Sequence, residues 1–147
     1  KIKKNEKINI EDETSDFILS ICNNSIRLLI NYLEKFNLID KKININDAKN
    51  ICTNISFLDY EKYTKYWYID KNYENGIKYM FDIYNKGYSV MDILDNYFSF
   101  IKITNIIPEN IKYKIIKIIC KYISIFHNDH EYEIELAFFT NDLIKNI

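Results

Sequence analysis

The sequence predicts an all-α protein in two parts, a small three-helix unit over residues 1–56 and a five-helix bundle over residues 57–147. Apolar residues recur at intervals of three and four along most of the chain, which is the spacing of one buried helix face. The composition, 48% hydrophobic and 28% charged residues in a chain of 147, is sufficient for a buried core. Longer and more aromatic helices begin near Phe57, so we place the boundary between Ser56 and Asp59.

Two similar stretches, residues 7–12 and 42–47, lead into helices of the first unit. Each alternates apolar and polar residues and then meets a capping residue, a pattern typical of a short extended segment before a helix. We expect these two leads to pair with each other. The spacing predicts one helix from about Asp12, a second from Ile26 to Phe36, and a third carrying Ala48, Ile51, Cys52 and Ile55.

The second helix carries a cation in its first turn. Ser25 or Asn24 is a suitable N-cap, and Arg27 lies opposite the predicted buried face. That face consists of Ile26, Leu29, Ile30, Leu33 and Phe36. A cation at the positive end of the helix dipole costs about 0.3 to 1 kcal/mol, and no acidic residue lies three or four positions away to offset it.

A helix N-terminus with an unpaired arginine is a natural receptor for a phosphate, because each charge-assisted hydrogen bond contributes about 1.5 to 3 kcal/mol. The alternative is a solvated surface arginine, or one paired with an acidic residue from elsewhere in the fold. The sequence leaves both interpretations of Arg27 open.

The second part contains five predicted helices. The first carries Tyr60, Tyr63 and Trp67, and the second carries Tyr73, Ile77, Met80, Phe81 and Tyr84 and ends near Gly87. Ser89 begins a third with Val90, Ile93, Leu94, Tyr97 and Ile101 buried, and Pro108 begins a fourth with Ile111, Ile115, Ile118, Ile119 and Tyr122. We expect Asp129 and Glu131 to open the last helix.

That last helix has apolar residues on two faces. Ile134 and Phe138 lie on one, and Leu136, Phe139 and Leu143 lie on the other. One protomer core rarely needs both, so the surplus indicates helix contacts between subunits.

Composition excludes several classes of protein. The three cysteines, Cys22, Cys52 and Cys120, are odd in number and far apart, which indicates reduced core thiols of an intracellular protein. The isoleucine-rich stretch 111–126 is interrupted by lysines, so we expect no membrane span. Lys and Arg (20) nearly balance Asp and Glu (21), and any contact with nucleic acid would therefore need a local patch.

Three clusters have a functional and a structural interpretation. His127 and His130 have the spacing of metal ligands, but we favour a polar linker because no clustered Cys or further His accompanies them. The aromatic run around Tyr60, Tyr63 and Trp67 has the chemistry to stack on single-stranded bases, but its helical spacing favours packing. A stripe of lysines, namely Lys114, Lys117 and Lys121, has the charge to follow phosphates, but a solvated helix face is the more usual explanation.

The first unit combines the order of elements from Ile2 to Ser56, the arginine in a first helical turn and the connection LIDKKININDA (residues 38–48). In these features it resembles the lid of an AAA+ ATPase, as in small subunits of replication factor C, the sliding-clamp loader. The segments KGYSVMDIL (residues 86–94) and EIEL (residues 133–136) resemble the collar domain of that family. The resemblance implies an AAA+ lid at residues 1–56 and a collar, or oligomerisation, domain at residues 57–147.

The family's sensor-two motif is Gly-Asp, any residue, then Arg, whereas this sequence has Asn24-Ser25-Ile26-Arg27. Only Arg27 carries over, and the resemblance implies that it reaches the phosphates of a bound nucleotide. We identify no catalytic and no metal-binding residue. The chain lacks the Gly-x-x-x-x-Gly-Lys-Ser/Thr loop, the acidic magnesium-binding motif and the trans-acting arginine motif, so as given it cannot hydrolyse ATP.

The resemblance implies that the chain is the C-terminal part of a clamp-loader small subunit that mediates ring assembly and ATP-state sensing in DNA replication. The chain begins with Lys1, and we expect it to be the rear part of a longer protein that binds ATP and magnesium. Its partners would be other clamp-loader subunits and, through the full complex, the sliding clamp and primer-template DNA. The alternative is a free-standing helical nucleic-acid-binding or scaffold module.

The expected location is the nucleus or a cytoplasmic replication site. The richness in Ile, Asn, Lys and Tyr indicates an AT-rich genome, such as that of a parasite or a large DNA virus.

Overall fold

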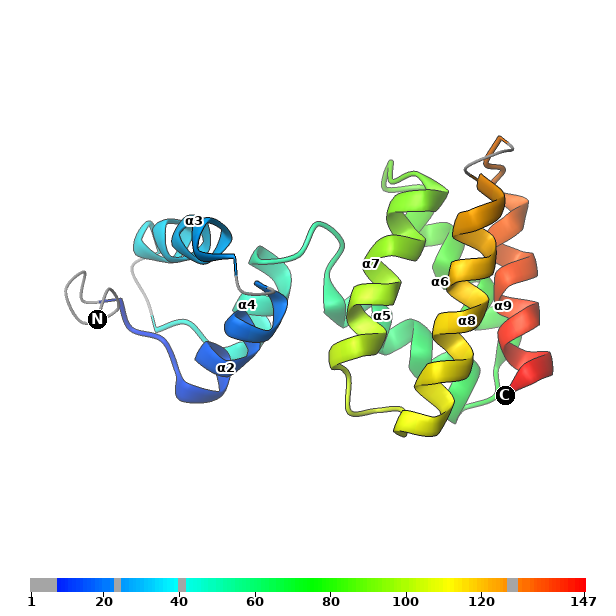
Figure 1. The fold of residues 1–147 in the computed structure, drawn as a ribbon, viewed down its shortest axis with the longest axis horizontal. Helices are drawn as coiled ribbons and strands as arrows, with labels where there is room; N and C mark the ends of the chain where they lie inside the picture. The colour runs from blue at the N-terminus through cyan, green and yellow to red at the C-terminus, as the bar shows by residue number, and fades with distance from the viewer. Residues whose placement is uncertain (1–7, 23–24, 40–41, 127–129) are drawn as a thin grey trace. The chain divides into compact units, whose positions relative to one another are not determined.

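The computed structural model describes residues 8–22, 25–39, 42–126 and 130–147 (Figure 1). The chain divides into two compact units, Lys1–Leu58 and Asp59–Ile147. The described residues are helical with a single isolated β-bridge, which confirms the predicted all-α class. The first unit contains α2 (Asp12–Ile21), α3 (Ile26–Asn37), α4 (Ile45–Ile51) and the start of α5 (Phe57–Thr64). The second contains the rest of α5, the π-helix η1 (Lys65–Ile69), α6 (Tyr73–Tyr84), α7 (Val90–Ile103), α8 (Glu109–Phe126) and α9 (Ile134–Asn146).

The two extended leads pair with each other, as predicted, and the pairing is parallel. Ile10 and Ile43 form the β-bridge. The Ile43 amide donates to the Asn9 carbonyl at 2.8 Å, and the Glu11 amide donates to the Ile43 carbonyl at 3.3 Å. Both isoleucines are buried, so the bridge fixes the starts of α2 and α4 over one small core.

The buried face of α3 differs from the predicted one. Phe36 is buried and Leu29 and Leu33 are half-buried, but Ile26 is 72% exposed and Ile30 also faces solvent. Leu28 and Tyr32 take their places against the core of the first unit. The helix has apolar residues around most of its circumference, and the position of the core decides which of them are covered.

The second unit is built around hydrogen-bonded aromatic side chains. Tyr60, Tyr63, Trp67 and Tyr97 are fully buried. The Tyr97 hydroxyl bonds both Thr64 Oγ1 and Trp67 Nε1 at 3.2 Å, and the Tyr63 hydroxyl bonds Thr140 Oγ1 of α9 at 2.9 Å. Burying these rings stabilises the bundle while their polar atoms remain satisfied. The aromatic run is therefore core, and the base-stacking interpretation of Tyr60, Tyr63 and Trp67 is wrong.

The start of α7 uses a residue that we assigned to another helix. Ser89 is the N-cap, as predicted, and its hydroxyl accepts from the Asp92 amide at 3.0 Å. Glu131, which we expected to open the last helix, instead accepts from the Met91 amide at 2.7 Å through its Oε2. A carboxylate there satisfies an orphan amide and complements the helix dipole. The helix α9 begins later, at Ile134, and Asp129 lies outside the described residues.

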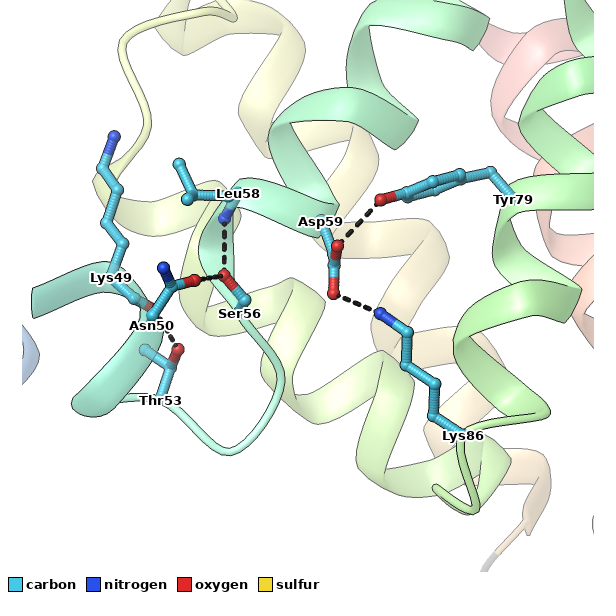
Figure 2. Close-up of polar contacts among 8 residues, drawn as sticks. All are labelled: Lys49, Asn50, Thr53, Ser56, Leu58, Asp59, Tyr79 and Lys86. Carbon is cyan, nitrogen blue, oxygen red and sulfur yellow. Dashed lines mark hydrogen bonds and ion pairs between the residues drawn. The ribbon is translucent and has the colours of Figure 1, made fainter. Parts of the chain in front are cut away.

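Figure 2 shows the polar contacts on each side of the division between the units. In the first unit, Ser56 Oγ donates to Asn50 Oδ1 at 2.6 Å and accepts from the Leu58 amide at 3.3 Å. In the second unit, Asp59 accepts from the Tyr79 hydroxyl and from Lys86 Nζ, each at 2.8 Å. The two contacts of Asp59 hold this residue of α5 to α6 and to the turn that follows α6.

Candidate functional site

Three surface features of the described residues carry candidate functional side chains: an apolar row on α9, Arg27 on α3, and a row of lysines on α8. All three were identified as candidates from the sequence, although the groove that the lysines line was not. Arg27 lies in the first unit and the other two lie in the second, and they are described separately.

The helix α9 has one buried and one exposed apolar face. Leu136, Phe139 and Leu143 are fully buried, and Phe139 packs edge-on against Tyr97 and Tyr122. Ile134 and Phe138, one turn apart, are 49% and 52% exposed. We call these two residues the α9 row. The predicted two-faced pattern is confirmed, and the α9 row is available to another molecule because the bundle is already complete without it.

Arg27 is exposed in the first turn of α3. Ser25, one of the two predicted candidates, is the N-cap, and its hydroxyl accepts from the Leu28 amide at 3.3 Å. The first turn contains no acidic residue, and Arg27 makes no ion pair with any residue that the structure describes. Asn24 and its neighbour Asn23 lie outside the described residues, so the turn that departs from the sensor-two pattern is not described. The role of Arg27 remains a prediction.

The cysteines divide into two kinds. Cys22 and Cys52 are buried in the first unit, as predicted, and burial raises the pKa of the Cys52 thiol to about 12. At neutral pH such a thiol stays protonated, which makes it inert as a nucleophile. Cys120 was predicted to be a core thiol, but it is exposed on α8. The apolar spacing of α8 placed it at the margin of the buried face, and the neighbouring helices leave that margin uncovered.

Only one member of the candidate metal pair lies among the described residues. His127 lies outside the described residues, and His130 is exposed and contacts the ring of Tyr132. Over residues 8–22, 25–39, 42–126 and 130–147, no three side chains of His, Cys, Asp or Glu gather as metal ligands would. Within the same ranges, no helix is both long enough and apolar enough to cross a membrane.

The lysine stripe predicted on α8 is exposed along its full length, and it lines a groove against α9. Sequence spacing identified the three lysines but gave no sign of the groove, since its other wall comes from residues more than 20 positions away. Asp142 is the acidic residue of that wall.

Comparison with known families assigns part of the chain. Residues 59–123 match the family model of the replication factor C C-terminal domain, which spans most of α5 to most of α8. No curated protein matches the sequence. The matched domain is a non-catalytic part of clamp loaders, and its start coincides with that of the second unit.

Proposed function

Because residues 59–123 match the family model of the replication factor C C-terminal domain, we propose that this chain is the C-terminal part of a clamp-loader small subunit that holds its subunit in a hetero-oligomeric ring. The family implies DNA replication and assembly with other clamp-loader subunits. The exposed α9 row supports the finer statement that assembly runs through α9. A replication factor fits a nuclear or a cytoplasmic replication site.

The observation that carries the proposal is the exposure of Ile134 and Phe138 beside a finished core. Burying the exposed half of two such side chains contributes about 1 kcal/mol each, and apolar or aromatic anchors of this kind dominate protein interfaces. Thr140 anchors this part of α9 to the bundle, because its hydroxyl is hydrogen-bonded to the Tyr63 hydroxyl and to the Leu136 carbonyl. The row is thereby held on a rigid support.

The proposal extends to the first unit. There, the exposed Arg27 would meet the phosphates of ATP bound, with magnesium, by a preceding ATPase module of the full-length protein. Such contact would make the position of the unit depend on the nucleotide state, because the arginine would bind one state more strongly than the other. Sliding clamp and primer-template DNA would be partners of the assembled complex.

Co-expression of the full-length protein with the other clamp-loader subunits, followed by size-exclusion chromatography, tests the assembly role. The double variant Ile134→Asp/Phe138→Asp should no longer co-elute with the other subunits, since two new charges would have to be desolvated in the interface. Its matched control is Ile69→Asp, which places a charge at an apolar side chain that is 55% exposed but lies outside the α9 row.

Far-UV circular dichroism should show the same helical content for wild type and both variants. Undiminished co-elution of the double variant would exclude α9 as the assembly surface. Loss of co-elution in the control alone would move the interface to η1.

A further inference from the structure

The exposed face of α8 is strongly basic. Its exposed residues from the first turn to the last include Lys114, Lys117 and Lys121, and no acidic residue follows Glu109 in the helix. Glu109 itself is occupied, because it accepts from the buried Lys112 at 2.7 Å. The whole chain has a formal net charge of −1, so this concentration of positive charge is local.

These lysines line a groove between α8 and α9 of roughly 610 Å³. Its wall on α9 includes Asp142, whose Oδ2 accepts from Lys121 Nζ and from the Tyr122 hydroxyl, each at 3.1 Å. Asp142 therefore offsets one lysine. Lys114 and Lys117 have no ion pair within the part of the chain that the structure describes, so their charges remain available to a ligand.

We propose that this groove binds the phosphodiester backbone of a nucleic acid. From Lys114 to Lys121 the helix rises about 10 Å, and a duplex strand presents a phosphate about every 3.4 Å along its axis. The row therefore spans about three phosphates of one strand. Lysine suits such a contact, because its flexible stem carries a point charge that releases counterions without needing a fixed geometry.

An acidic protein segment is the competing ligand. Protein interfaces take most of their affinity from apolar or aromatic anchors in desolvated pockets. Among the residues that the structure describes, no aromatic one lines the groove; its lining residues other than Ile118 and Cys120 are lysines, Ser124, Asp142 and Asn146. Nucleic acid needs no such anchor, since electrostatics alone supplies non-specific binding. The proposal is independent of the assembly role of α9.

The test is fluorescence anisotropy of a labelled DNA duplex of about 20 base pairs titrated with the 147-residue chain at about 50 to 200 mM KCl. The test variant is Lys114→Gln/Lys117→Gln. The control is Lys62→Gln/Lys78→Gln, which removes the same charge at two exposed lysines of α5 and α6. Both variants should retain the circular dichroism spectrum of the wild type.

The groove variant should bind about tenfold or more weakly at the lowest salt, and the slope of log K against log [salt] should fall by about 2, or roughly 0.9 per lost phosphate contact. The control should match the wild type. Repeating the titration with single-stranded DNA distinguishes the form of the backbone, because each contact should then contribute about 0.7 to the slope.

Equal weakening of both variants would overturn the proposal, since total charge rather than the groove would then set the affinity. Absence of duplex binding by the wild type at the lowest salt would also overturn it. Binding of polyglutamate in place of DNA would assign the groove to an acidic protein segment. Because the groove variant retains the α9 row, its co-elution with clamp-loader subunits separates failure of this proposal from failure of the assembly role.

Discussion

Arg27 combines exposure with an unfavourable position at the positive end of a helix. The first turn of α3 contains no acidic residue, and Ser25 occupies the Leu28 amide. A bound phosphate would offset the repulsion between the guanidinium and the positive end of the helix dipole, because both would attract the same anion. A phosphate ligand at Arg27 is therefore a prediction that a substitution can test.

Replacing Arg27 with alanine in the full-length protein should lower ATP affinity about 10- to 150-fold, the equivalent of losing 1.5 to 3 kcal/mol of charge-assisted hydrogen bonding. Equilibrium titration with a fluorescent ATP analogue measures this. Arg27→Lys should recover only part of the loss, since lysine keeps the charge but not the planar fork. Unchanged affinity in Arg27→Ala would mean that the side chain serves no nucleotide-sensing role.

Single residues show where sequence reasoning succeeded and where it failed. A cap at Ser25 or Asn24 and a buried Leu94 could be predicted, because capping chemistry and helical spacing are local properties. The exposure of Ile26 could not, because α3 has apolar residues on nearly all sides and spacing alone does not choose between faces. The α8 groove was equally inaccessible, since it requires knowledge of which helix lies beside the lysines.

At the scale of elements, the connections between helices depend on residues far apart in sequence. Glu131 caps α7 across 40 positions, whereas local rules assigned it to the helix that follows. Helix starts that are capped by a side chain adjacent in sequence, such as Ser89, could be predicted. Those that are capped by a side chain far away in sequence could not. The two glycines provide a test of how far local backbone rules hold.

Gly76 and Gly87 should respond in opposite directions to the same added methyl group. Gly76 lies inside α6, and a Cβ there would meet Trp67 Cβ at 3.5 Å, an ordinary contact. Gly76→Ala should therefore raise the free energy of unfolding by about 0.5 to 1 kcal/mol through helix propensity. Gly87 has a φ of 98°, so Gly87→Ala should lower it by about 1 to 2 kcal/mol although the space is open.

Urea denaturation followed by the fluorescence of Trp67 measures both changes, and each variant is the control for the other. Destabilisation by Gly76→Ala would mean that α6 cannot accept a methyl group against η1. A neutral Gly87→Ala would mean that the turn after α6 adjusts its backbone at little cost.

At the scale of the whole molecule, the two units differ in the size of their cores. The second unit contains the largest buried side chains, among them Trp67, Tyr60, Tyr63 and Tyr97. The core of the first unit consists of smaller residues such as Ile18 and Ile43 around Phe36, and several apolar side chains of α3 are only partly covered. A unit of about 60 residues buries a smaller fraction of its surface than a larger one and is correspondingly marginal.

The first unit should therefore unfold before the second. Trp67 is the only tryptophan and lies in the second unit, so its fluorescence reports on that unit, whereas far-UV circular dichroism reports on both. In urea, the circular dichroism signal should begin to fall while the fluorescence is still native, which violates two-state behaviour. Ile43→Val, in the first core, should shift only the early phase by about 0.5 to 1.5 kcal/mol, and Ile93→Val, in the second, only the late phase. Coincident transitions, with each substitution shifting both signals, would show instead that the two units unfold as one cooperative body.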